Sequence, residues 1–304
     1  MSTVHQYFQD INIAGTVLFD EPMSRHTTFQ VGGPADVFVT PRNEDDIPPV
    51  LSIASTVGAP LFVLGGGANI LVADAGIRGV VLDISALNEL GREGTLLHCG
   101  AGAEVTAVTS YAADAGLGGI DFLHSMPGSI GGAIWMNARC YGSSIVDILR
   151  EVRGVTSEGA RFVYRPRQDD WEYKRSPFQS RKDVITSCDF ALFREEPSEV
   201  WDRMLGYYRD REQKGHFSAP SAGSVFKNNR AFGKPSGAII DSLGLRGKQI
   251  GGAKISDRHA NIIVNTGHAT AREIRDLMEE VRQKVREELG FELEQEVLYV
   301  GEWV

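Results

Sequence analysis

Two clusters of glycine, each followed by an asparagine, constrain this chain more than any other feature of its sequence. The first cluster follows the strand-like run LFVL and consists of Gly65, Gly66, Gly67, Ala68 and Asn69. The second lies within residues 126–133, MPGSIGGA, with Asn137 after it. Consecutive glycines let a backbone approach a ligand closely and present its N–H groups to a phosphate. A tight turn explains a single cluster better, but two such clusters together favour a bound pyrophosphate.

The composition narrows the class of protein. The chain has 304 residues, of which 42% are hydrophobic and 23% charged, as in a globular protein of about two domains. Its net charge of −9 argues against nucleic-acid binding. Residues 227–259 nevertheless carry seven basic and two acidic side chains. A small-anion site, such as one for a diphosphate, and a solvated surface are equally good interpretations of that stretch.

Several motifs and targeting signals are missing from the sequence. GxGxxG, the Walker lysine loop, HExxH and GxSxG do not occur, which weighs against a classical Rossmann domain, a P-loop NTPase, a zinc hydrolase and a serine hydrolase. The three cysteines are isolated, so neither a disulfide framework nor a metal site is expected. Without a signal peptide or a long apolar run, we expect a cytoplasmic protein that does not enter a membrane.

Short strands separated by glycine turns are predicted for the first half of the chain. Strands are predicted for residues 36–40, 61–64, 79–84, 95–99 and 183–193, a hairpin for 151–164 and a helix for 106–115. The pattern then changes, and a helix at 198–214 and strands at 260–265 and 293–300 are predicted. Thr270 and Glu273 form a capping box before an amphipathic helix that ends at Gly290. These changes place a domain boundary within residues 195–215.

Longer motifs surround the glycine clusters. They are residues 23–35 (MSRHTTFQVGGPA), 65–69 (GGGAN), 126–142 (MPGSIGGAIWMNARCYG), 220–228 (PSAGSVFKN), 247–265 and 293–301. In this order they resemble the motifs of UDP-N-acetylenolpyruvoylglucosamine reductases. That family reduces the enolpyruvyl ether of a UDP-sugar to UDP-N-acetylmuramate for peptidoglycan synthesis. The resemblance runs from about residue 20 to the C-terminus, and the ordered set is far more specific than any one motif.

The resemblance implies an α+β fold with an FAD-binding region of the vanillyl-alcohol-oxidase (PCMH) type. Residues 1–197 would form that region, in subdomains of roughly 1–85 and 86–197, and residues 198–304 would bind the UDP-sugar. FAD would be held non-covalently, with NADPH as co-substrate and the chain as a monomer. The residues that the resemblance assigns to FAD are Gly65, Gly66, Gly67, Ala68, Asn69, Pro127, Gly128, Ser129, Gly131 and Gly132.

The reaction that the resemblance implies requires an acid and a stabilised negative charge. A hydride reaches the terminal enolpyruvyl carbon, charge builds on the neighbouring carbon and its carboxylate, and a proton must then be delivered. By resemblance Ser224 is the proton donor and Glu296 the catalytic glutamate. Without the motifs they would be a turn serine and a solvated strand residue. The residues implied for substrate binding are Tyr173, Arg175, Lys227, Asn228 and His259.

Two positions depart from the family's pattern. Lys174 stands where the family usually has an arginine, and it keeps the charge but loses the planar two-pronged donor. Lys174 acting as a point charge, Arg175 turning in and a slow enzyme are the three interpretations. We favour Lys174, because neighbours on an extended segment point to opposite sides. Arg139 and Cys140 replace the usual Gly-Ala; a covalent flavin bond is one reading of Cys140, but a buried thiol is favoured.

Two other functions stay open. The first is a different FAD-dependent oxidoreductase of the same fold, against which the GSVFKN and EQEV motifs of the substrate domain argue. The second is a non-catalytic UDP-sugar-binding homologue, suggested only by Lys174 and opposed by the presence of Ser224 and Glu296. The sequence does not decide between NADPH and NADH.

Overall fold

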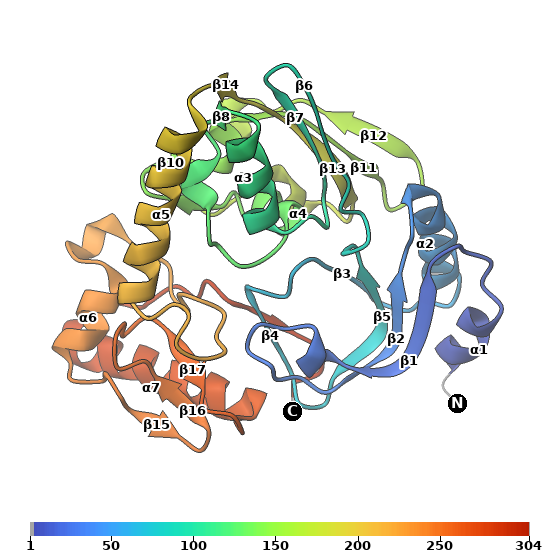
Figure 1. The fold of residues 1–304 in the computed structure, drawn as a ribbon. Coiled ribbons are helices and arrows are strands. Elements are labelled where there is room, and N and C mark those ends of the chain that lie inside the picture. The colour runs from blue at the N-terminus through green and yellow to red at the C-terminus, as the bar shows by residue number, and fades with distance from the viewer. Residues whose placement is uncertain (1–2, 304) are drawn as a thin grey trace. The chain divides into compact units, whose positions relative to one another are not determined.

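The computed structural model describes residues 3–303 and divides the chain into two compact units (Figure 1). Unit 1 comprises Met1–Asp20, Asp36–Gly66 and Gly79–Tyr208, and unit 2 comprises Glu21–Ala35, Gly67–Arg78 and Arg209–Val304. The domains predicted from the sequence follow one cut near residue 197, whereas these units are interleaved along the chain. Two segments from the N-terminal half pack with the C-terminal residues because their apolar side chains share one core there.

Unit 1 is built on two sheets. The elements that lie wholly or mostly in this unit are α1 (Thr3–Gln9), β1 (Thr16–Pro22), β2 (Pro34–Thr40), α2 (Ile47–Thr56), β3 (Leu61–Leu64), β5 (Ile77–Asp83), β6 (Leu90–Glu93), β7 (Leu96–Gly100), α3 (Val105–Asp114), β8 (Leu117–Gly118), α4 (Ile130–Trp135), β9 (Arg139–Cys140), β10 (Ser143–Ser144), β11 (Leu149–Val155), β12 (Arg161–Tyr164), β13 (Val184–Ala191), β14 (Phe193–Arg194) and α5 (Pro197–Gln213). One sheet has the strand order β1-β2-β5-β3, with β3 parallel to β5. The other is antiparallel in the order β12-β11-β13-β7-β6. α4 packs against β7 and β13 of the second sheet (Figure 1).

Unit 2 has a smaller sheet packed on a long helix. Its elements are β4 (Ile70–Val72), α6 (Ser236–Ser242), β15 (Gln249–Ile250), β16 (Ala253–Ile255), β17 (Ile263–Asn265), α7 (Ala271–Leu289) and β18 (Leu298–Val300). The strands β15, β16 and β17 form an antiparallel sheet next to α7, and β18 pairs in parallel with β4. Phe29, Val31 and Leu71 are buried in one core with the apolar side of α7. Those three side chains bring the two N-terminal segments into this unit.

Most of the elements predicted from the sequence are confirmed. The predicted strands in unit 1, the hairpin β11–β12 and the helices α3, α5 and α7 lie within a few residues of their expected ranges. Two predicted strands are shorter than expected, since β17 begins at Ile263 and β18 at Leu298. The residues before them make only isolated bridges, Ile262 with Ser224 and Gln295 with Phe226. Helices α2, α4 and α6 had no prediction from the sequence.

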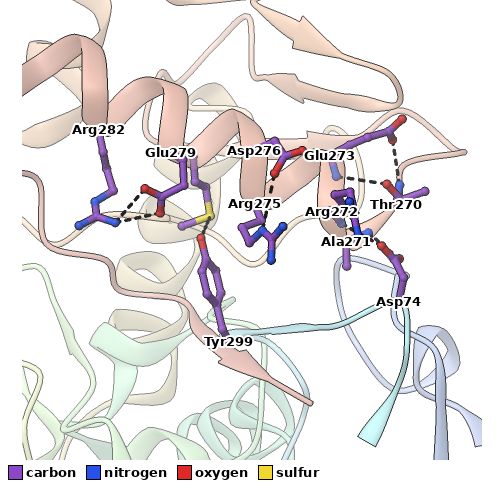
Figure 2. Close-up of polar contacts among 11 residues, drawn as sticks. Asp74, Thr270, Ala271, Arg272, Glu273, Arg275, Asp276, Glu279, Arg282 and Tyr299 are labelled. Carbon is purple, nitrogen blue, oxygen red and sulfur yellow. Dashed lines mark hydrogen bonds and ion pairs between the residues drawn. The ribbon is translucent and has the colours of Figure 1, made fainter. Parts of the chain in front are cut away.

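The N-terminus of α7 shows how the interleaved segments are fastened (Figure 2). Thr270 and Glu273 make the predicted capping box, and bonds from the N–H groups of Thr270 and Gly252 lower the pKa of the Glu273 carboxyl. The next two N–H groups, of Ala271 and Arg272, donate to the carboxylate of Asp74 at 2.8 and 2.9 Å. The backbone donors that a helix start leaves without intrahelical partners are therefore satisfied by side chains. Within residues 3–303, no helix combines the length and the apolar character needed to cross a bilayer.

We expect Asp74→Ala to lower the free energy of unfolding by about 1–3 kcal/mol, since it removes two charge-assisted bonds and a negative charge at a helix N-terminus. The urea midpoint of the FAD-loaded protein measures the effect. Asp276→Ala removes an exposed carboxylate from the same helix and should change stability by less than about 0.5 kcal/mol. An equal loss in both variants would show that Asp74 does not cap α7.

Candidate active site

The predicted site residues fall in both units, and each group is described within its own unit. In unit 1 the two glycine clusters touch each other through their backbones. A side-chain Cβ placed on Gly66 would lie 2.6 Å from Cα of Gly128, and one on Gly65 would lie 2.4 Å from Oγ of Ser129. Distances this short do not occur between real Cβ atoms and their neighbours. Gly66 therefore requires glycine, because its neighbours are backbone atoms, whereas a side chain at position 65 would displace the Ser129 hydroxyl. The structure therefore brings together two segments that are about sixty residues apart in the sequence.

The second loop is held by strand-like bonds to residues 101–105. The N–H of Val105 donates to the carbonyl of Gly128, and the N–H groups of Ile130 and Gly131 donate to the carbonyls of Ala103 and Ala101. Ser129 is the N-cap of α4, and its Oγ accepts the N–H of Gly132 at 3.3 Å. Ser129 is thus bonded within the protein, and its assignment to FAD in the sequence analysis stays a prediction.

The glycines of the two loops divide into packing and open positions. Gly131 is buried, and a Cβ on it would meet Ala101 Cβ at 2.9 Å. Gly67, in unit 2, is also buried, and its Cβ position lies 2.0 Å from the carbonyl oxygen of His26. Gly132 is partly exposed, with nothing closer to its Cβ position than Ser129 Oγ at 3.4 Å. No contact inside the protein therefore requires glycine at position 132. A substitution there would test for a bound ligand without disturbing the loops.

This arrangement fits a dinucleotide such as FAD. Gly66 and Pro127 are exposed, and Gly65, Gly128 and Gly132 are partly exposed. At the glycines this surface is backbone without side chains, which a diphosphate can approach to hydrogen-bonding distance. The residues present are compatible with the cofactor that the sequence motifs imply.

In unit 2 the first loop's asparagine holds the backbone of the predicted catalytic glutamate. Asn69 Nδ2 donates to the carbonyl of Glu296 at 3.0 Å, and the N–H of Leu298 donates to the carbonyl of Asn69 at 3.0 Å. Ala68, its neighbour, is half-buried. The GGGAN segment thus combines the turn predicted to bind the cofactor with a support for the Glu296 backbone. No sequence signal indicated the second role.

The predicted proton donor begins an extended segment that lies between two others. Ser224 bridges Ile262 on one side. On the other side, Phe226 bridges Gln295, and the N–H of Glu296 donates to the carbonyl of Val225 at 2.9 Å. The backbone of Glu296 is therefore bonded to the residue next to Ser224.

A buried amide fixes this segment from the side. Asn261 accepts the N–H of Phe226 through Oδ1 at 3.1 Å and donates from Nδ2 to the carbonyl of Phe226 at 2.8 Å. The Asn261 side chain is 2% exposed. Loss of this amide would leave a buried backbone donor and acceptor without partners. No feature of the sequence indicated Asn261, whose position near the start of the apolar run 260–265 gives no sign of this contact.

Lys227 and Asn228, predicted to bind substrate, already have partners in unit 2. Lys227 Nζ lies 2.6 Å from Oε1 of Glu294. Asn228 Oδ1 accepts the N–H of Ser236 at 2.8 Å, at the start of α6. A negatively charged substrate group could bind Lys227 only by replacing Glu294 as its partner. The amide nitrogen of Asn228 could bind a substrate while Oδ1 keeps its bond to Ser236.

The basic stretch at 227–259 is largely neutralised by carboxylates. The ion pairs are Lys227–Glu294, Arg246–Asp241, Lys248–Glu280 and Lys254–Asp257. For these four cations the structure favours the surface interpretation over a small-anion site, because each already pairs with a carboxylate.

His259 differs from those cations because it is half-buried beside another histidine. Its ring centroid lies 5.7 Å from that of His216, and burial is the main cause that lowers the pKa of both rings, that of His216 to about 4. The N–H of Asn261 donates to Nδ1 of His259 at 3.2 Å. The neutral ring therefore carries its proton on Nε2, which makes it a hydrogen-bond donor there.

Lys174 lies in a tight turn, and the extended segment assumed in the sequence analysis is wrong. The N–H groups of Glu172 and Arg175 each donate to the other's carbonyl at 3.1 Å, which leaves Tyr173 and Lys174 at the tip. Lys174 has a φ of 59°, in the left-handed region that residues other than glycine seldom adopt. Arg175, at the base, is exposed, and its Nη1 lies 3.5 Å from Oε2 of Glu172. Strand alternation therefore gives no reason to choose between Lys174 and Arg175.

The other departure, Arg139 and Cys140, forms a short strand. Cys140 is half-buried rather than buried, and its Sγ lies 4.0 Å from Sδ of Met126. Arg139 is exposed and donates from Nη2 to the carbonyl of Gly142 at 3.2 Å. These contacts give Cys140 a sulfur neighbour and Arg139 a local partner.

Comparison with known proteins identifies the class first. The FAD binding domain family matches residues 35–163, and the family of UDP-N-acetylenolpyruvoylglucosamine reductase C-terminal domains matches residues 215–300. The structure of BBE-like 1 from Physcomitrella patens resembles this fold with a TM-score of 0.50 at 18% identity, covering 64% of this chain and 45% of that one. The protein thus has the α+β fold of PCMH-type FAD-binding proteins, with a further C-terminal domain.

Full-length relatives identify the family. The chain is 38% identical to UDP-N-acetylenolpyruvoylglucosamine reductase of Treponema denticola, over 95% of each chain. It is 36% identical to the reductase of Clostridium botulinum, over 97% of this chain and 96% of that one. The crystal structure of the Thermus caldophilus reductase superposes with a TM-score of 0.80 at 30% identity, covering 95% of this chain and all of that one. The chain belongs to the UDP-N-acetylenolpyruvoylglucosamine reductase family.

We expect Gly66→Ala to weaken FAD binding by more than about tenfold, because its methyl group would push the two loops apart. Gly132→Ala meets no close contact in the protein, so a similar loss in this variant would come from the cofactor itself. Flavin fluorescence during titration of the apoprotein measures both affinities.

Gly206→Ala is the matched control, because its Cβ position, in α5, has nothing within 4 Å. Its FAD affinity should equal that of the wild type. Unchanged affinity in Gly66→Ala and Gly132→Ala would remove the loops from the cofactor site.

Proposed function

We propose that this protein reduces UDP-N-acetylenolpyruvoylglucosamine to UDP-N-acetylmuramate, with FAD as cofactor and NADPH as reductant. The observation that carries the proposal is the bonding of the Ser224 segment to the Glu296 backbone within unit 2 of a chain that belongs to this family. Ser224 and Glu296 are both half-buried and lie in unit 2, which contains the match to the reductase C-terminal domain. Steps of peptidoglycan precursor synthesis occur in the cytoplasm, where we place this protein as a monomer that binds neither membrane nor nucleic acid.

The residues have separate tasks in this reaction. Bound FAD would supply hydride-transfer chemistry between NADPH and the terminal carbon of the enolpyruvyl group. The open faces of Gly66, Gly128 and Gly132 would hold its diphosphate. Ser224 would protonate the carbon next to the substrate carboxylate and would itself recover a proton from solvent. The C=C bond is thereby reduced by one hydride and one proton.

The groups around that carbon would stabilise the negative charge that develops on it and on the substrate carboxylate. Lys174 would place its ammonium near the substrate carboxylate, where negative charge develops. Glu296 would help by donating a hydrogen bond itself or by orienting another donor, because a carboxylate anion beside an anionic intermediate opposes the reaction. The residues we assign to substrate contact are Tyr173, Arg175, Lys227, Asn228 and His259, the last as a neutral donor through Nε2.

Flavin absorbance, measured under anaerobic conditions, tests the proposed reaction. NADPH should bleach the bound FAD, and added UDP-N-acetylenolpyruvoylglucosamine should restore the oxidised spectrum. Bleaching without restoration would indicate a different FAD-dependent oxidoreductase. Substrate binding by a protein that neither binds FAD after reconstitution nor turns over would indicate a UDP-sugar-binding homologue.

We expect Ser224→Ala to bleach at the wild-type rate but to recover its oxidised spectrum at least about 100-fold more slowly, because only the second half-reaction needs a general acid. Stopped-flow absorbance separates the two steps. Ser218→Ala removes an exposed hydroxyl six residues upstream and should leave both unchanged. Equal recovery in Ser224→Ala and wild type would exclude Ser224 as the proton donor.

With saturating substrate, Lys174→Ala should slow the same recovery about 100-fold. Arg175→Ala should slow it by less than about twofold, because Arg175, exposed beside the Glu172 carboxylate, would contribute to substrate binding and not to charge stabilisation. Lys174→Arg, which restores the family's usual residue, should retain most of the activity. A large effect of Arg175→Ala together with an active Lys174→Ala would transfer the role to Arg175.

A further inference from the structure

The turn that carries Lys174 adopts a backbone conformation that needs support. A non-glycine residue in the left-handed region is strained, so such a turn persists only where its surroundings hold it. The turn has its own pair of bonds between Glu172 and Arg175, but both of these residues are exposed. Further support comes from the C-terminal end of α4 and the residue Asn137 that follows it.

Three side chains connect the turn to that helix end. Gln179 Nε2 donates to the carbonyl of Lys174 at 3.0 Å and to the carbonyl of Trp135, the last residue of α4, at 2.9 Å. Ser176 Oγ donates to the same Trp135 carbonyl at 2.7 Å. Asn137 Nδ2 donates to the carbonyl of Glu172 at 2.8 Å. Because both partners of Gln179 are carbonyl oxygens, its amide nitrogen uses both hydrogens, one for the turn and one for the helix.

Gln179 occupies a particular place among these contacts. Its bond is made to the carbonyl of Lys174 itself, whereas Asn137 and Ser176 hold the base of the turn and the chain after it. The first turn of α4 carries Gly132 of the cofactor loop, and its last residue carries the carbonyl that Gln179 uses. A six-residue helix spans about 9 Å, so this connection is short and rigid.

We propose that Gln179 is a positioning residue that fixes Lys174 relative to the cofactor loop through α4. The inference rests on the proposed function, in which Lys174 stabilises the charge that develops during the second half-reaction. A displacement of about 1 Å at a charged catalytic group can cost about 100-fold in rate. Gln179 does not itself touch substrate or cofactor in this proposal; it acts through the backbone of Lys174.

The variant that tests this is Gln179→Met, which keeps the length of the side chain and removes both donors. Reduction of the flavin by NADPH should stay within about twofold of wild type, because Lys174 has no part in that step. Recovery of the oxidised spectrum on addition of substrate should slow about tenfold or more. Ser180→Ala is the matched control, since this exposed neighbour bonds only to the carbonyl of Pro177 among the contacts described, and both of its rates should equal those of wild type.

A double-mutant cycle distinguishes positioning from a general structural role. In a Lys174→Ala background, Gln179→Met should change the recovery rate by less than about twofold, because the group being positioned is gone. An equal slowing in both backgrounds would show that Gln179 acts on the fold and not through Lys174, and would overturn the proposal. Recovery at the wild-type rate in Gln179→Met alone would overturn it as well.

The wild-type protein separates this inference from the proposed function. If substrate does not reoxidise the reduced wild type, the proposed function and the positioning role both fail. If the wild type is reoxidised and Gln179→Met is unaffected, only the positioning role fails.

Discussion

Backbone contact between the two glycine loops is the constraint on which unit 1 depends. Gly66 lies against the backbone of Gly128 and Ser129 at distances that no side chain allows, and Gly65 lies against the Ser129 hydroxyl. This contact fixes where the second loop runs, and that loop leads directly into α4, which begins at Ile130. The far end of α4 in turn holds the turn around Lys174. A close approach that only glycine permits thus determines the start of a short chain of contacts that reaches a predicted catalytic cation.

Unit 2 depends on residues that the sequence places far apart. Asp74 satisfies the start of α7, almost two hundred residues later in the chain. Asn69 holds the backbone of Glu296 at a still greater separation. The GGGAN segment therefore serves two purposes, because its first glycines meet the second loop in unit 1 and its asparagine supports the glutamate in unit 2. This double use explains why part of a loop with a cofactor signature belongs to unit 2, for which we propose substrate binding.

The candidate site could be predicted from the sequence where the motif itself carries the chemistry. Both glycine loops, Ser224 and Glu296 came from ordered motifs, and the structure brings the loops together and bonds the Ser224 segment to Glu296. The prediction that Lys174 and Arg175 point to opposite sides assumed an extended backbone. The reciprocal bonds of Glu172 and Arg175 make a turn instead, so strand alternation does not apply there. The partners of the basic stretch were hidden too, since Lys248 pairs with Glu280 on α7.

Local patterns in the sequence determined the helices, the strands and the glycine loops of this protein, because propensity, capping and hydrophobic period act over a few residues. They also determined its family, through motifs that keep their order along the chain. Only the tertiary structure decided that residues 21–35 and 67–78 join the C-terminal unit, and that Asn261, Asp74 and Gln179 hold the backbone of distant segments. Such contacts are made by polar side chains with backbone groups far along the chain, and every residue offers nearly the same backbone N–H and carbonyl. A sequence therefore shows that these donors and acceptors exist, but the fold alone selects which of them meet.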